Sequence, residues 1–220
     1  MGNLKAAIFD MDGVIIDSEP IHYQVNQEIY KELGIEIDDQ EYNTFIGLSN
    51  TDNWTILKEK YNLQDSIEEL VARQNNKNIG HLENSNQQAI AGIKHLLEEL
   101  EREDIKIALA SSSSYKYIKA VLSKFGISDY FSIKVSGEDM DRGKPHPDIF
   151  LETARRLGVD AQDCMVIEDS KNGVKAAKGA GMKCIGFINP NSGNQDLSLA
   201  DDKVDSIDTL SVSSLKKLML

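Results

Sequence analysis

Short apolar runs alternate with amphipathic stretches along most of the chain. The runs are bounded by polar residues, which is typical of strands buried on both faces of a parallel sheet. They predict strands at residues 4–9, 105–110, 133–135, 165–167 and 183–187. The stretches between them carry apolar residues at helical spacing and predict helices at 90–100, 118–125, 147–157 and 172–180. This alternation predicts an α/β fold, a doubly wound parallel sheet with right-handed crossovers.

One block near the N-terminus interrupts this alternation. Residues 17–82 show helical periodicity without a convincing strand, and the first helix begins near Pro20, a residue typical of a first helical turn. Apolar residues then recur at every fourth position over 21–33. Further helices are predicted at 51–61 and 66–79. We predict an all-helical cap domain at 17–82, inserted into an α/β core formed by 1–16 and 83–220.

Composition and charge narrow the classes of protein and partner. Of the 220 residues, 40% are hydrophobic and 27% charged, as in a soluble globular protein with a sizeable core. The net charge of −12 argues against nucleic-acid or anionic-membrane partners, which need a basic face. No apolar run reaches the roughly 18 residues of a membrane span, and no signal-peptide pattern is found, so we expect a cytoplasmic protein. We also expect a monomer. Cys164 and Cys184 lie in apolar runs and are predicted to be buried, reduced thiols.

The first predicted strand leads directly into two carboxylates. Asp10 and Asp12 are separated by one residue, and Gly13 lets the backbone turn sharply after them. Open α/β sheets place their chemistry at the carboxyl ends of such strands. There Asp10 can attack phosphorus, Asp12 can act as general acid and base, and a hard cation such as Mg²⁺ is needed because two close acids do not ionise freely. The same pattern also fits an ordinary turn, so companion residues must decide.

Polar residues follow the other predicted strands as well. Ser111 follows the second strand, Lys144 lies in the loop after the third, and Glu168 and Asp169 follow the fourth. Taken singly, they fit a helix N-cap, a solvated cation and the acids of a first helical turn. Because the carboxyl ends of parallel strands meet at one edge of a sheet, we expect these residues to lie together. Such a set predicts a phosphate held by Ser111 and Lys144 beside a metal held by Asp169.

These motifs, in this order, resemble those of the haloacid dehalogenase superfamily. The helical insertion after the first motif resembles the cap of the β-phosphoglucomutase-like branch, and the similarity extends over nearly the whole chain. The resemblance implies a Rossmann-like core, a Mg²⁺ cofactor and a covalent aspartyl-phosphate mechanism. It rests on Asp10-x-Asp12-Gly13, the strand end at Ser111, Lys144-Pro145 and Glu168-Asp169.

The resemblance also implies a role for each residue of these motifs. Asp10 is implied as the nucleophile and Asp12 as the general acid and base, while Lys144 holds Asp10 ionised. Mg²⁺ is implied to bind Asp10, Asp169 and the backbone carbonyl of Asp12, with Glu168 close by. The phosphoryl group is implied to bind Ser111, Ser112 and Lys144.

The cap is expected to select the substrate, a small phosphate ester. The loop 46–50 lies between two predicted cap helices and is a candidate substrate-facing loop, although a plain connector fits the sequence equally well. His22 matches a mutase position on the first cap helix, within a segment that also resembles many plain phosphatases. The candidate cap contacts are His22, Gly47, Ser49, Asn50 and Arg73.

The cap also bears on the type of reaction. A phosphohexomutase must hold the second phosphate of a bisphosphate, which calls for cations in the cap. In the mutase pattern an Arg stands where this chain has Asn50 and a Lys where it has Gln74, and 41–57 contain no Lys or Arg. Arg73 and Lys77 are the candidate substitutes. We therefore favour a phosphomonoester hydrolase, with a β-phosphoglucomutase-type phosphohexomutase as the alternative and a non-catalytic phosphoester-binding protein as a third hypothesis. A sugar phosphate is the expected substrate by family analogy alone.

Overall fold

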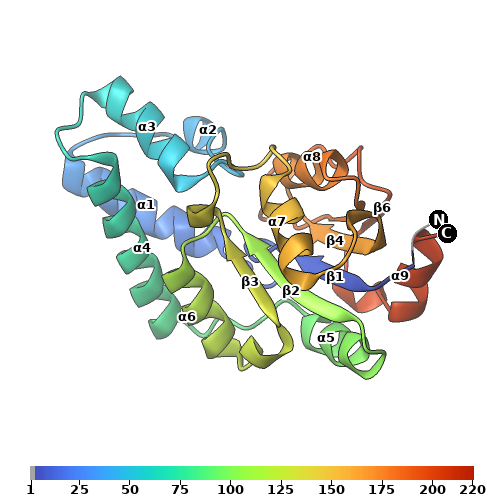
Figure 1. The fold of residues 1–220 in the computed structure, drawn as a ribbon. Coiled ribbons are helices and arrows are strands. Elements are labelled where there is room, and N and C mark those ends of the chain that lie inside the picture. Colours follow the sequence, from blue (N-terminus) through green and yellow to red (C-terminus); the bar gives the residue numbers. More distant parts are fainter. Residues whose placement is uncertain (1–2) are drawn as a thin grey trace.

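The centre of the molecule is a parallel sheet with the strand order β3-β2-β1-β4-β5-β6 (Figure 1). The computed structural model describes residues 3–220, so residues 1 and 2 of the predicted core lie outside the described residues. The predicted α/β fold is confirmed, and the five predicted strands correspond to the first five strands of the sheet. The strands are β1 (Ala6–Phe9), β2 (Lys106–Ser111), β3 (Ile133–Ser136), β4 (Cys164–Glu168), β5 (Lys183–Phe187) and β6 (Asp202–Val204).

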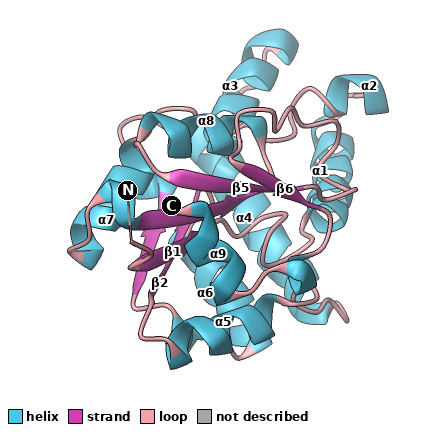
Figure 2. Cartoon of the chain, turned by 90° about the vertical axis from the view of Figure 1, so that its right-hand side faces the viewer, coloured by secondary structure: helices cyan, strands magenta, loops and turns pink. Residues whose placement is uncertain are grey.

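Helices cover both faces of this sheet. The core helices are α5 (Ile93–Arg102), α6 (Tyr115–Phe125), α7 (Asp148–Leu157), α8 (Lys171–Gly179) and α9 (Val212–Leu218). Short 3-10 turns lie at Ser128–Tyr130, Gly137–Asp139, Ala161–Asp163 and Ile207–Thr209. Helices α7 and α8 pack on one face, and α5 and α6 on the other. Figure 2 shows α8 on one side of β5 and α5 with α9 on the other.

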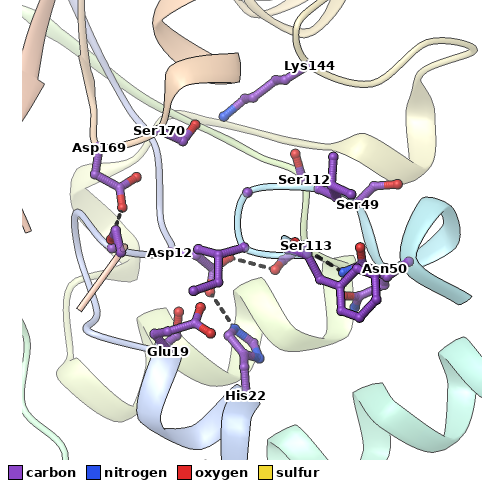
Figure 3. Close-up of a pocket in the computed structure, with 18 of the residues that line it drawn as sticks. Asp12, Glu19, His22, Ser49, Asn50, Ser112, Ser113, Lys144, Asp169 and Ser170 are labelled. Carbon is purple, nitrogen blue, oxygen red and sulfur yellow. Dashed lines mark hydrogen bonds and ion pairs between the residues drawn. The ribbon is translucent and has the colours of Figure 1, made fainter. Parts of the chain in front are cut away.

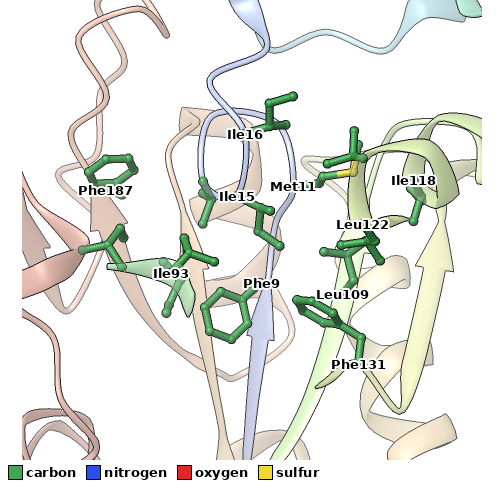
Figure 4. Packing of buried hydrophobic residues seen from close by; sticks show 14 of the residues in the cluster. Phe9, Met11, Ile15, Ile16, Ile93, Leu109, Ile118, Leu122, Phe131 and Phe187 are labelled. Carbon is green, nitrogen blue, oxygen red and sulfur yellow. The ribbon is translucent and has the colours of Figure 1, made fainter. Parts of the chain in front are cut away.

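Alternate residues of β1 point to opposite faces of the sheet. Ala6 and Ile8 pack in the cluster under α7 and α8, whereas Ala7 and Phe9 belong to the larger cluster under α5 and α6. All four side chains are fully buried, which explains why this strand appears in the sequence as a continuous apolar run. Figure 4 shows Phe9 in the larger cluster, where its ring meets Phe131 edge to face at a centroid distance of 6.1 Å.

The register of the sheet brings the carboxyl ends of β1, β2 and β4 close together. Phe9, the last residue of β1, lies opposite Leu109 of β2 and Ile167 of β4. The Asp10 backbone N–H continues this pairing by donating to Ile167 O at 3.0 Å. The residues that follow these strands therefore emerge at one edge of the sheet, close to each other although far apart in the sequence.

Four helices follow β1 and lie together on one side of the sheet (Figure 1, upper left). They are α1 (Glu19–Leu33), α2 (Asp39–Tyr42), α3 (Asn50–Tyr61) and α4 (Ile67–Asn84). Helix α4 packs on α1 and α3, and it also contacts α6 of the core. The two segments that join these helices to the core pair with each other: Ile90 N donates to Ile15 O at 2.9 Å, and Gln87 Nε2 donates to Asp17 O at 2.7 Å.

Several elements differ from the prediction. Helix α4 continues through Gly80 to Asn84, beyond the predicted end at residue 79, because Leu82 is fully buried and its packing outweighs the low helix propensity of glycine. The polar stretch 189–202 predicts a loop or an edge, and its last residue begins β6. This edge strand is short and charged, so no apolar run marks it. The short helices α2 and α9 were not predicted.

The remaining sequence predictions concern thiols and membranes. Cys164 and Cys184 are both buried and free, as predicted. Burial raises the pKa of the Cys164 thiol to about 12, so this thiol stays protonated at neutral pH. Within residues 3–220, no helix is both long and apolar enough to span a membrane.

Asp201 joins β5 to the segment before β6. Its carboxylate accepts hydrogen bonds from the Cys184 backbone N–H at 2.9 Å, from Lys178 Nζ at 2.5 Å and from Lys183 Nζ at 3.1 Å. Burial opposes ionisation, but these three donors outweigh it and hold the pKa of Asp201 below its usual value. A carboxylate with a lowered pKa stabilises the folded state above its ordinary pKa, near 3.9, and this contribution is lost as pH falls through the folded value.

We expect Asp201→Asn to lower the free energy of unfolding by about 1 kcal/mol at pH 7, because the two lysines lose their partner and are only partly screened. The difference from the wild type should shrink as pH falls below about 4, the range in which the wild-type carboxylate also loses its charge. Urea denaturation at pH 7 and pH 3 measures the difference in the free energy of unfolding and its change with pH. Asp202→Asn is the control, since it changes an exposed neighbouring carboxylate outside this set of bonds. If Asp201→Asn were destabilised as much at pH 3 as at pH 7, the charge of Asp201 would not be the source of the stability.

Candidate active site

The carboxyl end of β1 holds two buried acids bridged by one lysine. Lys144 Nζ donates to Asp10 Oδ1 at 2.6 Å, to Glu168 Oε1 at 2.7 Å and to the Ala110 carbonyl at 3.2 Å. The side chains of Asp10, Glu168 and Lys144 are only 8%, 1% and 7% exposed. Asp10 follows β1, Lys144 lies in the loop after β3, and Glu168 ends β4. The structure thus brings together three residues that the sequence pattern assigns to one sheet edge.

This cluster contains more negative charge than its lysine can neutralise. Burial raises the pKa of Asp10 to about 8, because Lys144 offsets burial only in part and the charges of Glu168 and Asp12 add to it. Burial and the charges of Glu168 and Asp10 likewise raise the pKa of Asp169 well above its usual range. The two carboxylates beside Lys144 raise its pKa despite burial, so it stays charged. A nucleophilic Asp10 must be ionised, which requires a further cation.

The residues around Asp10 fit a Mg²⁺ ion. Mg²⁺ prefers oxygen ligands, keeps several waters and is usually bound through one or two carboxylates. Asp10 and Asp169 are two buried carboxylates whose ionisation needs a counter-charge. Within residues 3–220, no three Asp, Glu, His or Cys side chains converge as a metal cluster. Both oxygens of Glu168 are engaged by Lys144 and Ser170.

Asp12 points toward the first cap helix (Figure 3). Its Oδ1 lies 3.2 Å from His22 Nε2, and its Oδ2 accepts from Ser113 Oγ at 2.7 Å. Burial opposes ionisation of Asp12, but the pKa of this carboxyl is held below its usual value. The hydrogen bond and the charge of His22 lower it, and so do hydrogen bonds from the hydroxyls of Ser113 and Ser18. Burial would lower the pKa of His22, but Asp12 and Glu19 outweigh it and raise the value. A cap residue therefore orients the second acid.

The serines after β2 divide differently from the prediction. Ser112 and Ser113 line the pocket, whereas Ser111 does not. Ser111 is the last residue of β2 and is buried, and its Oγ lies 3.4 Å from Asp12 Oδ2 and accepts from the Ser113 backbone N–H at 3.0 Å. Ser111 thus supports Asp12 and Ser113 in this structure, and its contact with a phosphoryl group stays a prediction. Four consecutive serines gave no sequence signal for choosing among them.

A loop after β5 reaches into the site, although the sequence indicated no function for it. Ser192 Oγ donates to Asp169 Oδ2, and Asn189 Nδ2 donates to the Gly13 carbonyl at 2.9 Å. Ser192 and Gln195 line the pocket. The loop therefore holds both a candidate metal ligand and the turn after β1. Its Asn, Ser and Gly residues are ordinary loop residues, so composition alone could not reveal these contacts.

The cap places most of its candidate substrate contacts in the pocket. His22, Gly47, Ser49 and Asn50 all line it, and Asn172 Nδ2 of the core donates to the Gly47 carbonyl at 3.3 Å. In Figure 3, Ser49 and Asn50 are drawn with Ser112 and Ser113 among the side chains that line the pocket.

The two candidate cap cations lie elsewhere. Arg73 does not line the pocket and instead donates to Asp65 at 3.0 Å. Lys77 pairs with Glu28 at 3.2 Å and with Glu32 at 2.9 Å. Neither residue supplies the cation that the mutase pattern has in the cap, because each is held by acids outside the pocket. The prediction of Arg73 as a substrate contact is therefore not supported.

Gly13 offers a test of the site's packing. Its φ is +80°, and a Cβ there would lie 1.9 Å from Asp169 Oδ2 and 2.9 Å from Ser192 Oγ. We expect Gly13→Ala to displace Asp169 and to weaken Mg²⁺ binding at least about tenfold, as measured by isothermal titration calorimetry. Gly34→Ala is the matched control: its φ is +69° but its Cβ would meet nothing within 4 Å. Equal Mg²⁺ affinity in both variants would contradict this role of Gly13.

Comparison with known proteins gives the family. Residues 7–187 match the model of the haloacid dehalogenase-like hydrolases. The chain is 32% identical over 220 residues to hexitol phosphatase B of Escherichia coli K12, covering 96% of each chain. It is 34% identical over 192 residues to β-phosphoglucomutase of Bacillus subtilis, covering 83% of each. A solved β-phosphoglucomutase from Clostridium difficile matches with a TM-score of 0.86 and 30% identity, over 98% of this chain and 97% of that one. The chain therefore belongs to the haloacid dehalogenase-like hydrolase family, which confirms the resemblance inferred from its motifs.

Proposed function

We propose that this protein is a Mg²⁺-dependent phosphatase that hydrolyses a small phosphorylated carbohydrate, acting as a cytoplasmic monomer. The observation that carries the proposal is the buried Asp10 carboxylate, 2.6 Å from Lys144, in a pocket that Asp12 also lines. A carboxylate held this way has a cation beside it for the phosphoryl oxygens and a second acid within reach of a leaving group. Similarity to hexitol phosphatase B supports a carbohydrate phosphate as the substrate.

The reaction has two halves, both at phosphorus. A carboxylate oxygen of Asp10 bonds to phosphorus while the bond from phosphorus to the leaving oxygen breaks, and Asp12 gives that oxygen a proton. Asp12 then takes a proton from water, whose oxygen bonds to phosphorus as the bond to Asp10 breaks. The products are an alcohol, inorganic phosphate and the Asp10 carboxylate. Ser111, Ser112 and Lys144 are the proposed phosphoryl contacts, and Ser113 is added to them because it lines the pocket beside Ser112.

Side chains around Asp10 hold these groups in place. Asp10, Asp169 and the Asp12 carbonyl would hold Mg²⁺, which when bound supplies positive charge next to the phosphoryl oxygens. Glu168 acts as a support for Lys144, since its two oxygens accept from Lys144 and from the Ser170 N–H and hydroxyl. The cap excludes bulk water while it is closed and reopens for product release.

A phosphohexomutase is the second candidate, favoured by the 34% identity to β-phosphoglucomutase. A mutase must hold the distal phosphate of a bisphosphate with cations in the cap. Among the described residues that line the pocket, Lys144 is the only Lys or Arg, and it lies at the phosphoryl end. Arg73 and Lys77 are held by acids outside the pocket. This distribution of charge favours transfer to water over transfer to a second sugar hydroxyl.

We expect Asp10→Asn to abolish Mg²⁺-dependent hydrolysis of p-nitrophenyl phosphate, with kcat falling by roughly three orders of magnitude or more, because the amide cannot replace the nucleophile. Release of nitrophenolate measures this directly. Asp141→Asn is the control, since Asp141 is exposed in the loop that carries Lys144 and does not line the pocket. A wild type that binds Mg²⁺ but hydrolyses no ester of a broad panel would instead support a non-catalytic phosphoester-binding protein.

The choice between phosphatase and mutase can be made by ³¹P NMR. The protein is mixed with Mg²⁺, β-glucose 1-phosphate and a trace of glucose 1,6-bisphosphate as primer. We expect inorganic phosphate to appear without glucose 6-phosphate, because the cap supplies no cation for a distal phosphate. Accumulation of glucose 6-phosphate would make the protein a mutase and would contradict this conclusion.

A further inference from the structure

A chain of hydrogen bonds runs through the cap along the pocket wall. Trp54 Nε1 donates to Gln74 Oε1 at 2.8 Å, and Gln74 Nε2 donates to Asn26 Oδ1 at 2.7 Å. Asn26 Nδ2 then donates to the Tyr42 hydroxyl at 3.5 Å, and that hydroxyl donates to Glu19 Oε1 at 2.8 Å. We call these five residues the cap relay. All four cap helices contribute to it, α1 with two residues and the others with one each.

The relay has one direction, and it is fixed from both ends: the indole N–H of Trp54 can only donate, and the Glu19 oxygen accepts the one hydrogen of the Tyr42 hydroxyl. An indole Nε1–H can only donate, so Gln74 must turn its carbonyl oxygen to Trp54 and its nitrogen to Asn26. Asn26 must then turn its own carbonyl to Gln74 and its nitrogen to Tyr42. If either amide were reversed, a donor would face a donor or an acceptor would face an acceptor. Buried polar groups would then be left without a hydrogen-bond partner. Without Trp54, nothing at that end of the relay would distinguish the two orientations of Gln74.

Four members of the relay belong to the pocket wall, and Trp54 does not. Glu19, Asn26, Tyr42 and Gln74 line the pocket, while Trp54 is 1% exposed and does not reach it. Each amide nitrogen has a second hydrogen beyond its relay bond, and Glu19 has a second oxygen. Figure 3 shows Glu19 near Asp12 and His22. The wall therefore presents N–H donors and a carboxylate acceptor, the complement of hydroxyl groups, which both donate and accept.

The same wall is unsuited to a charged leaving group. The described part of the pocket has its one lysine at Asp10, at the far end from the relay amides. A second phosphate or a carboxylate on the leaving group would lie against two amides and Glu19, and His22 of the same pocket is already engaged by Asp12. Desolvating an anion in such a place is unfavourable.

We propose that the cap relay selects a leaving group with several uncharged hydroxyls, a polyol or sugar bearing one phosphate. Trp54 is a positioning residue of this specificity, because its indole N–H holds the Gln74 carbonyl at the end of the relay that does not reach the pocket. This inference rests on the proposed phosphatase function and adds to it the residues that choose the substrate.

The test compares two monophosphates that differ in their leaving groups. p-Nitrophenyl phosphate has no hydroxyl on its leaving group, and sorbitol 6-phosphate has several. Trp54→Phe removes the indole N–H and keeps an aromatic ring beside Tyr30, whose ring centroid is 6.0 Å away. We expect kcat/KM for sorbitol 6-phosphate to fall about tenfold while that for p-nitrophenyl phosphate changes less than about twofold. Tyr30→Phe is the matched control, since it removes a buried hydroxyl outside the relay, and it should change neither value.

A second variant keeps the inference testable should Trp54→Phe not fold. Trp54→Met also removes the indole N–H but fills the space with a flexible apolar side chain, and the same selective loss is expected. In the wild type, fructose 1,6-bisphosphate should be hydrolysed at least about tenfold less efficiently than sorbitol 6-phosphate.

Several outcomes would overturn the inference. Equal losses on both monophosphates would give the relay a merely structural role, and no loss on sorbitol 6-phosphate would remove its role in specificity. A wild type that hydrolyses p-nitrophenyl phosphate through Asp10 but prefers no hydroxylated substrate would overturn the relay inference alone. Failure of the proposed function is distinct, because it would appear as no Asp10-dependent hydrolysis of any ester.

Discussion

One lysine faces three buried acids at the carboxyl end of β1, and this imbalance of charge shapes the rest of the site. Lys144 bridges Asp10 and Glu168, and Ser170 occupies the second oxygen of Glu168. The excess negative charge therefore remains on Asp10 and Asp169, whose pKa values burial raises. A sheet that is apolar on both faces leaves no water beneath these groups, so the charge must be met by ligands from above. The site is arranged for a cation and a phosphoryl group together.

The sequence revealed the charged part of this site and missed its neutral part. Asp10, Lys144 and Asp169 stand out because charged residues directly after buried strands have few structural uses. Ser113 and Ser192 were missed for a physical reason: a hydroxyl in a loop is common, and its partner depends on how distant segments meet. The same limit applies to Arg73. Its charge suggests a substrate contact, but the sequence does not reveal that Arg73 pairs with Asp65.

The fold was predictable where burial leaves a pattern. Strands β1 to β5 are apolar runs because helices cover the sheet, and the amphipathic stretches between them are the helices. The elements that escaped prediction are those held by distant contacts. The end of α4 depends on the burial of Leu82, and β6 is an edge strand of three residues whose exposed charges carry no periodicity. In both cases tertiary packing outweighs the local sequence signal.

The paired connections between cap and core determine how the pocket can open. The relay ties α1, α2, α3 and α4 into one unit, so bending within the cap would break buried hydrogen bonds. The two connecting segments instead lie against each other, joined by Ile90 to Ile15 and by Gln87 to Asp17. Hinges are formed by a few residues of such connecting segments, so a motion of the cap relative to the core would be absorbed here. Because the relay joins all four helices, the amide wall would move as one piece in an opening of the cap and would meet Asp10 with the same geometry on closing.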